Sequence, residues 1–436
     1  MMVKMVLIDG EHYPDVTAWA VKRLGDVCCA VFLGGTEKVG DLNEIERKVG
    51  VKVYYSRDYI DAIQRAIMEN DIHEAVDLSD EPVLTYEDRF RIASFLLANG
   101  ITYTGADFTF RPRRLLNINK PSLMVIGTGK RVGKTAVSGF VARTLKEIAK
   151  PAILTMGRGG PEEPEIIEGE RLEITPEFLL GIAEKGKHAA SDHLEDALTS
   201  RVLTIGCRRC GGGMAGFSFF DAVEEGIKIA EGLDNDLIIL EGSGATLPAV
   251  RADGCITVVG ATQKISFIRG YFGPFRIKLA DLIVVTMADL RSERRLESIK
   301  RVISKINPDA ELHLTKFIPR PLGRIEGKRV LLIMTANRKG LQRAASHLEE
   351  HYGVEVVGFS GHLSNRRKLI EDMRKFKGYD TVLVELKAAA VDVVTRRALD
   401  EGREVVFMDN EPVNIDGKDL RDSILNLGKR ILGERR

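Results

Sequence analysis

The sequence lacks the features of a membrane-spanning or secreted protein. None of its apolar runs approaches the roughly 18 residues that a membrane helix needs, and no apolar segment with a cleavage site follows the first residues. We therefore expect a soluble protein of the cytoplasm with no membrane partner. Lys and Arg number 64 against 63 Asp and Glu, so neither sign is in excess, and this argues against general nucleic-acid binding.

Cysteine is also scarce, since five in 436 residues do not make a disulfide framework. Cys207 and Cys210 have the spacing of half a zinc site or of a redox pair, but no second cysteine or histidine pair completes a tetrahedral set. The pattern favours two small residues in a glycine-rich loop. Only three glutamines accompany 29% charged residues, which indicates a thermophilic source.

Short β-rich apolar runs alternate with helical stretches along the whole chain, which is typical of an α/β protein with parallel sheets. The expected helices include Tyr59–Glu69, Tyr86–Ala98 and Pro176–Glu184. The length predicts two or three domains. A basic stretch with a proline, Arg111–Arg114, reads as a linker. We predict an N-terminal α/β domain at residues 1–114, a nucleotide-binding and catalytic domain at 115–326, and a C-terminal α/β domain at 327–436.

The strongest motif follows the strand expected at Leu123–Ile126 and opens a helix. It reads GTGKRVGKT and consists of Gly127, Thr128, Gly129, Lys130, Arg131, Val132, Gly133, Lys134 and Thr135. Glycines allow backbone N–H groups to approach phosphates, Lys134 would reach the outer phosphates, and the Thr135 hydroxyl suits Mg²⁺. Thr128 stands where the strict P-loop pattern has its first glycine, yet the strand–loop–helix context predicts a nucleotide site. We expect Lys134 to be accessible to solvent before nucleotide binds.

Acidic residues end two later strands. Glu241 follows four apolar residues and precedes a glycine-rich turn, so we predict that it holds Mg²⁺ together with Thr135. Asp289 ends the next such strand and is a candidate for contact with the nucleotide base. Glu241 as an ordinary strand cap is the alternative.

Cations gather on loops that should lie near the phosphates, because strand carboxyl ends line the ligand crevice of open α/β sheets. Lys130 and Arg131 in the P-loop either reach a transferred phosphoryl group or a second anion, or face solvent. The candidate residues for a multiply charged second substrate are Arg158, Gly159, Gly160, Arg208, Arg209, Arg251, Lys264 and Arg269. The candidate catalytic residues are Lys134, Lys130, Glu241 and Arg158.

Other polar groups give weaker signals. His188, Asp192 and His193 have near-helical spacing, which favours a solvated face. His362 and Glu385 lie at expected strand ends of the third domain and leave open a second small site there.

Several motifs resemble known families. The P-loop resembles that of dethiobiotin synthetase and related P-loop ligases, as does the EGSGA stretch from Glu241. The whole chain is more similar to the archaeal cyclic 2,3-diphosphoglycerate synthetase family, in LIDGEHYP from Leu7, TMGRGGPEEPE from Thr155 and ELKAAAVD from Glu385. This resemblance implies a central P-loop NTPase-type parallel sheet flanked by Rossmann-like α/β segments. It also implies ATP and Mg²⁺, and closure of a phosphoanhydride in 2,3-diphosphoglycerate with release of ADP and phosphate.

Two other readings stay open at this point. The same P-loop would serve a kinase or carboxylate-activating ligase for another anionic metabolite. It would also serve a nucleotide switch, although Thr286 and Met287 stand where a guanine-specific Asn-Lys would precede Asp289. We expect a homodimer because it is the commonest closed assembly.

Overall fold

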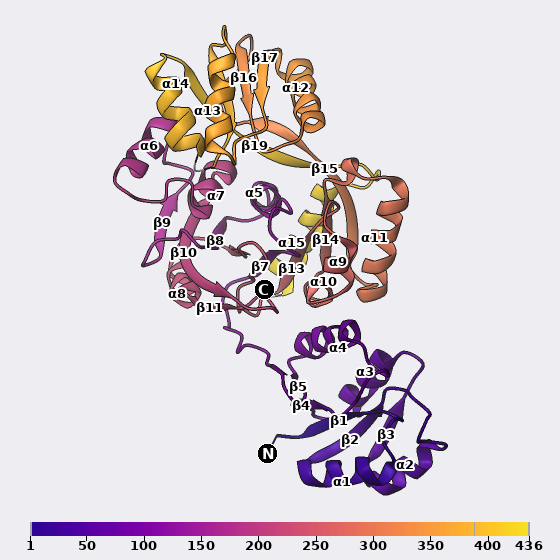
Figure 1. The fold of residues 1–436 in the computed structure, drawn as a ribbon. Coiled ribbons are helices and arrows are strands. Elements are labelled where there is room, and N and C mark those ends of the chain that lie inside the picture. The colour runs from indigo at the N-terminus through magenta and orange to yellow at the C-terminus, as the bar shows by residue number, and fades with distance from the viewer. Residues whose placement is uncertain (1, 388, 435–436) are drawn as a thin grey trace. The chain divides into compact units, whose positions relative to one another are not determined.

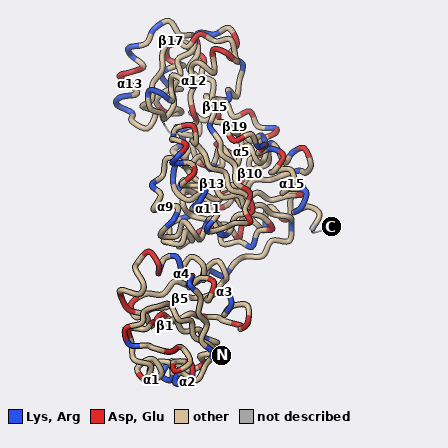
Figure 2. The backbone as a smooth tube through the Cα atoms, turned by 90° about the vertical axis from the view of Figure 1, so that its right-hand side faces the viewer, with Lys and Arg blue, Asp and Glu red and all other residues tan. Residues whose placement is uncertain are grey.

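The computed structural model describes residues 2–387 and 389–434, which fold into two compact units. Unit 1 comprises Met1–Arg114, Lys264–Leu279 and Arg301–Pro308, and unit 2 comprises Leu115–Gln263, Ala280–Lys300 and Asp309–Arg436. Basic and acidic residues are interspersed over both units (Figure 2). Within the described part of the chain we find no helix whose length and hydropathy would let it cross a bilayer.

Unit 1 contains one sheet whose strands follow the order β3-β2-β1-β4-β5-β6 (Figure 1). All its pairings are parallel except β5 with β6. The strands are β1 (Lys4–Ile8), β2 (Val27–Phe32), β3 (Lys52–Tyr55), β4 (Glu74–Asp77), β5 (Thr102–Thr104) and β6 (Thr109–Phe110). The helices are α1 (Pro14–Leu24), α2 (Leu42–Val49), α3 (Tyr59–Glu69), α4 (Tyr86–Ala98), α9 (Ile265–Arg269) and α10 (Gly273–Lys278).

Unit 2 is built on one continuous sheet in the order β11-β10-β8-β12-β7-β13-β14-β15-β19-β18-β16-β17, with β9 paired to β10. Its first strands are β7 (Ser122–Gly127), β8 (Pro151–Gly157), β9 (Glu165–Glu168), β10 (Leu203–Gly212), β11 (Ser218–Asp221), β12 (Leu237–Glu241), β13 (Gly254–Gly260) and β14 (Leu282–Thr286). The rest are β15 (Glu311–Pro321), β16 (Arg329–Ile333), β17 (Glu355–Ser360), β18 (Thr381–Glu385) and β19 (Glu404–Asn414). The core order β8-β12-β7-β13-β14 is parallel throughout and confirms the predicted P-loop-type α/β class.

Helices connect most of these strands in unit 2. They are α5 (Lys134–Leu145), α6 (Pro176–Glu184), α7 (Asp192–Ser200), α8 (Val223–Gly232), α11 (Glu293–Ile306, which continues into unit 1), α12 (Arg338–Tyr352), α13 (Arg366–Lys375), α14 (Arg396–Asp400) and α15 (Leu420–Glu434). A short 3₁₀ helix, Ala288–Leu290, and a π-helix, Ala390–Thr395, complete the set among the described residues.

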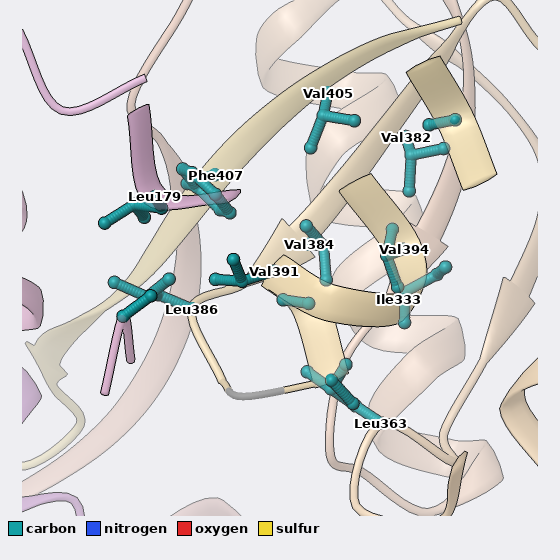
Figure 3. Packing of buried hydrophobic residues seen from close by; sticks show 14 of the residues in the cluster. Leu179, Ile333, Leu363, Val382, Val384, Leu386, Val391, Val394, Val405 and Phe407 are labelled. Atoms are coloured by element: carbon teal, nitrogen blue, oxygen red, sulfur yellow. The ribbon is translucent and has the colours of Figure 1, made fainter. Parts of the chain in front are cut away.

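Two long strands, β15 and β19, join two segments of unit 2. The P-loop segment comprises the residues of unit 2 from 115 to 326, and the C-terminal segment comprises residues 327–436. The first half of β15 pairs in parallel with β14, and its second half pairs antiparallel with β19. A shared core reinforces this junction, because Leu179 of α6 packs in one cluster with Phe407 of β19, Val384 of β18 and Val391 of the π-helix (Figure 3). Residues lining the carboxyl ends of β7, β12, β16 and β18 therefore belong to one packed unit.

The segment around the cysteines differs from its prediction as a glycine-rich loop. Cys207 and Cys210 lie within β10, which continues to Gly212 because β8 pairs with it up to Arg208 and β11 pairs with it from Arg209 onward. Cys207 is buried, Cys210 is exposed, and both are free thiols. A strand places neighbouring side chains on opposite faces, so the two arginines between them separate.

Candidate functional site: the P-loop cavity

The P-loop joins the end of β7 to the start of α5, as predicted. Gly133 has φ +83°, and a Cβ there would lie 2.3 Å from the Phe317 ring, so both the backbone conformation and the space require glycine. Thr128 replaces the first glycine without disturbing the loop. Its amide donates to the Val258 carbonyl (3.0 Å) and its hydroxyl donates to Gln263 Oε1 (2.6 Å), which ties the loop to the end of β13.

Lys134 and Glu241 form a buried ion pair between α5 and the end of β12. The two strands that carry them, β7 and β12, are parallel neighbours, so the P-loop and Glu241 lie at the same sheet edge. The Thr135 hydroxyl donates to the same carboxylate oxygen, Oε1, at 3.1 Å. Lys134 is 8% exposed and Glu241 is 0% exposed. The expectation that Lys134 is accessible to solvent is therefore wrong, because its ammonium group pairs with the Glu241 carboxylate at the end of β12.

A buried carboxyl group of α7 adjoins this pair. Asp196 is fully buried, and neither of its carboxyl oxygens accepts a hydrogen bond from a described residue, nor does Glu241 Oε2. Burial first, and then the charge of Glu241, raises the pKa of Asp196 well above its usual range. A set of carboxylate oxygens beside the Thr135 hydroxyl is the donor chemistry that a hard divalent cation prefers.

The spacing of His188, Asp192 and His193 indicated a solvated face, and of these only His188, which precedes α7, is exposed. Asp192 is half-buried. His193 is buried against β10, where a Cβ on Gly206 would lie 2.5 Å from its ring, and burial lowers its pKa. His193 is buried because α7 packs between α5 and β10. The charged residues of α7 give its sequence the pattern of an exposed helix, so this packing could not be predicted from the sequence. Nothing in the local pattern identifies Asp196 or Glu195 as site residues.

A cavity of about 1330 Å³ opens beside the P-loop within unit 2. Of the residues predicted from the sequence, it is lined by Gly129, Lys130, Arg131, Val132, Gly133, Lys134, Thr135, Arg158, Gly159 and Asp289. Asp289 forms an ion pair with Arg343 of α12, so its carboxylate has a cationic partner in this structure. The cavity also reaches the C-terminal segment, at residues 334–337 and 385–387 and at several positions of α12, none of which the sequence placed near the nucleotide.

The other predicted residues lie in several places. Gly127, Thr128, Gly160, Arg208, Arg209, Glu241 and Arg251 belong to unit 2 but are not among the described residues that line the cavity. Lys264 and Arg269 belong to unit 1, where Arg269 pairs with Glu87 at 2.8 Å.

Arg208 and Arg209 have different environments. Arg209 is buried and donates to the carbonyl oxygen (3.1 Å) and hydroxyl (3.2 Å) of Ser243, which lines the cavity. Burial and the charge of Arg158 lower the pKa of Arg209, and Arg209 Nε donates to no described residue. Arg208 is exposed and donates to the Gly160 carbonyl at 3.0 Å. Arg158 thus lines the cavity, and Arg209 lies close enough to Arg158 for their charges to interact. The Nε–H group of Arg209 is a donor that no described residue uses.

A glycine loop that opens a helix with Lys134 and Thr135, beside an acid at the end of a parallel neighbouring strand, defines a P-loop nucleotide-binding protein. Comparison with known proteins then gives the family. Family models of cyclic 2,3-diphosphoglycerate synthetase match the chain at residues 4–111 (N-terminal domain), 122–316 (P-loop domain) and 321–411 (C-terminal domain).

The proteins of that name from Thermococcus sibiricus and Thermococcus kodakarensis are 68% and 66% identical to this chain. Each alignment spans 434 residues and covers 99–100% of this chain and all of the relative. The chain belongs to the cyclic 2,3-diphosphoglycerate synthetase family, and the resemblance found in its motifs is confirmed. Among solved structures, LpxK of Aquifex aeolicus in complex with ATP aligns with 80% of this chain and 96% of its own, at 14% identity and a TM-score of 0.45.

Proposed function

We propose that this protein is an ATP-dependent ligase that converts 2,3-diphosphoglycerate into cyclic 2,3-diphosphoglycerate and releases ADP and phosphate. The observation that carries the proposal is the 68% identity over 434 residues with a relative named cyclic 2,3-diphosphoglycerate synthetase. The P-loop and its buried acid supply a site for the ATP that such a reaction consumes.

Two displacements account for the products. An oxygen of one substrate phosphate attacks the γ-phosphorus of ATP, the bond to the β,γ-bridging oxygen breaks, and ADP leaves. An oxygen of the neighbouring substrate phosphate then attacks the phosphorus that carries the new phosphoryl group, and inorganic phosphate leaves as the ring closes. Phosphate oxygens are ionised at neutral pH, so catalysis depends on positioning and charge stabilisation rather than on a general base.

The residues of this chain fit those needs. We assign the outer phosphates of ATP to Lys134 and the loop amides, with Lys130 near the transferred phosphoryl group. We assign Mg²⁺ to Thr135 and Glu241, whose oxygens adjoin the buried carboxyl of Asp196. When bound, the cation neutralises phosphate charge. To reach a phosphate, Lys134 would have to leave Glu241, so the buried ion pair would open when nucleotide binds.

The reaction is tested by incubating the purified protein with ATP, Mg²⁺ and either 2,3-diphosphoglycerate or another phosphorylated acid. The proposal expects ADP and inorganic phosphate in equal amounts, together with a cyclic phosphoanhydride visible by ³¹P NMR, with 2,3-diphosphoglycerate alone. ADP without inorganic phosphate would indicate a kinase. A product formed only with a different acid would indicate a ligase for that acid, and absence of any acid-dependent ADP release would leave the nucleotide switch.

The arginines near the cavity give a prediction with a built-in control. Arg209→Ala should weaken 2,3-diphosphoglycerate binding by roughly 10- to 150-fold, the cost of one lost charged hydrogen bond. ATP affinity should change far less, because Lys134 and the loop amides remain. Arg208→Ala is the matched control, since Arg208 is exposed and one residue away on the same strand.

Calorimetric titration of both ligands against both variants decides the role of Arg209, and Arg158→Ala should behave as Arg209→Ala does. Equal losses for ATP and substrate would move Arg209 to the nucleotide site. Losses as large in the Arg208 variant would mean that β10 as a whole had been disturbed.

The three-domain division at residues 114 and 326, the cytoplasmic location and the homodimer stay proposals. Limited proteolysis tests the first, cell fractionation the second and light scattering the third.

A further inference from the structure

Lys387 follows the end of β18, in the ELKAAAVD stretch that the proposed chemistry has not used. The segment that carries it is tied to both neighbouring strands through Glu385. One oxygen of that carboxylate accepts from the Thr335 amide after β16 (2.9 Å), and the other accepts from Asn410 Nδ2 of β19 (2.7 Å). Because both oxygens are engaged, Glu385 fixes the backbone that presents Lys387.

Lys387 and the P-loop line the same cavity. Arg131, Lys134 and Lys387 are all among its lining residues, and Lys387 is exposed toward it rather than packed away. A pocket for one small ligand usually measures about 300–1,000 Å³. At about 1330 Å³ this cavity has room for a second ligand beside the nucleotide.

Most carboxylates of the cavity wall are already matched by cations or donors. Asp289 pairs with Arg343, and Asp409 pairs with Arg143 and Arg320 at 3.2 Å each. Glu195 of α7 is the main electrostatic partner of Lys387 and raises its pKa, followed in effect by Glu385 and Asp192.

We propose that Lys387 binds a phosphate of the phosphoryl acceptor, 2,3-diphosphoglycerate. The acceptor site then consists of Arg158 and Arg209 from the P-loop segment and Lys387 from the C-terminal segment. The proposal rests on the proposed function, and it names the residue that holds the second anionic ligand. A substrate with two phosphates is matched by cations from both segments, and their joint binding holds it beside the P-loop. Lys387 exchanges its interaction with Glu195 for the phosphate when the acceptor binds.

The test is titration of 2,3-diphosphoglycerate into full-length protein loaded with a non-hydrolysable ATP analogue. We expect Lys387→Ala to weaken acceptor binding by at least about 10-fold and to change the affinity for the ATP analogue by less than threefold. Lys387→Arg should recover much of the loss because it restores the charge. Lys377→Ala is the matched control, since Lys377 is exposed in the same segment and is not a lining residue of the cavity.

Unchanged acceptor binding in Lys387→Ala, or an equal loss of acceptor and nucleotide, would overturn the inference. Failure of the wild-type protein to bind or turn over 2,3-diphosphoglycerate would instead overturn the proposed function. In that event titration with inorganic phosphate decides the site: a signal that disappears in Lys387→Ala and persists in Lys377→Ala supports it, and a signal independent of Lys387 rejects it.

Discussion

Replacing Lys134 with Ala should lower the turnover number at least ~10²-fold, the usual cost of removing one preorganised charge donor from a transition state. The lysine would stabilise negative charge on the phosphoryl group as it moves. The other cation of α5, Arg143, lies in the last turn of the helix and pairs with Asp409. The measurement is the rate of ADP release at saturating ATP and 2,3-diphosphoglycerate. Near-normal turnover would exclude the P-loop assignment.

The buried pair adds a second consequence to this substitution. Lys134→Ala leaves Glu241 buried without its cation, and breaking a buried pair in this way costs about 3–5 kcal/mol of stability. The double variant Lys134→Ala, Glu241→Gln removes the uncompensated charge, so it should regain much of the lost thermal stability and none of the activity. Calorimetric melting of both variants therefore separates a folding defect from a catalytic one.

Replacing Glu241 with Gln should raise the Mg²⁺ concentration needed for half-maximal activity at least about 10-fold, with a large fall in turnover. Loss of even an outer partner of a metal ligand typically costs 10–100-fold in metal affinity. Gln keeps the side-chain volume and one oxygen that can accept from Lys134 and Thr135, so the change is mainly one of charge. The measurement is a Mg²⁺ titration of ADP release.

Asp289→Asn is the control for Glu241→Gln, because Asp289 also follows a strand of the same sheet but pairs with Arg343. It should show the Mg²⁺ dependence of the parent. If Asp289→Asn shifts the Mg²⁺ titration and Glu241→Gln does not, Asp289 holds the cation and Glu241 is only a cap at the end of β12.

Features that depend on neighbouring residues could be predicted from the amino-acid sequence. The helices expected at Tyr59–Glu69, Tyr86–Ala98 and Pro176–Glu184 have those bounds in the structure. Each begins after an Asp or Thr whose side chain accepts a hydrogen bond from a first-turn amide, which is a local signal. The P-loop is equally local, since its glycines, Lys134 and Thr135 lie between one strand and one helix. The family resemblance also needed no coordinates.

Contacts between residues far apart in the chain could not be predicted, because they depend on the order of the strands and on how the helices pack. Lys134 and Glu241 are separated by 107 positions, and only the pairing of β7 with β12 buries them together. The packing of α7 between α5 and β10 buries His193, which the spacing of its polar neighbours had placed at the surface. It also buries Asp196, for which the sequence pattern makes no prediction. Lys387 meets the P-loop only because β15 and β19 merge two segments into one sheet. Local patterns specify elements and loops, whereas sheet order and packing select which of their charged side chains share a cavity.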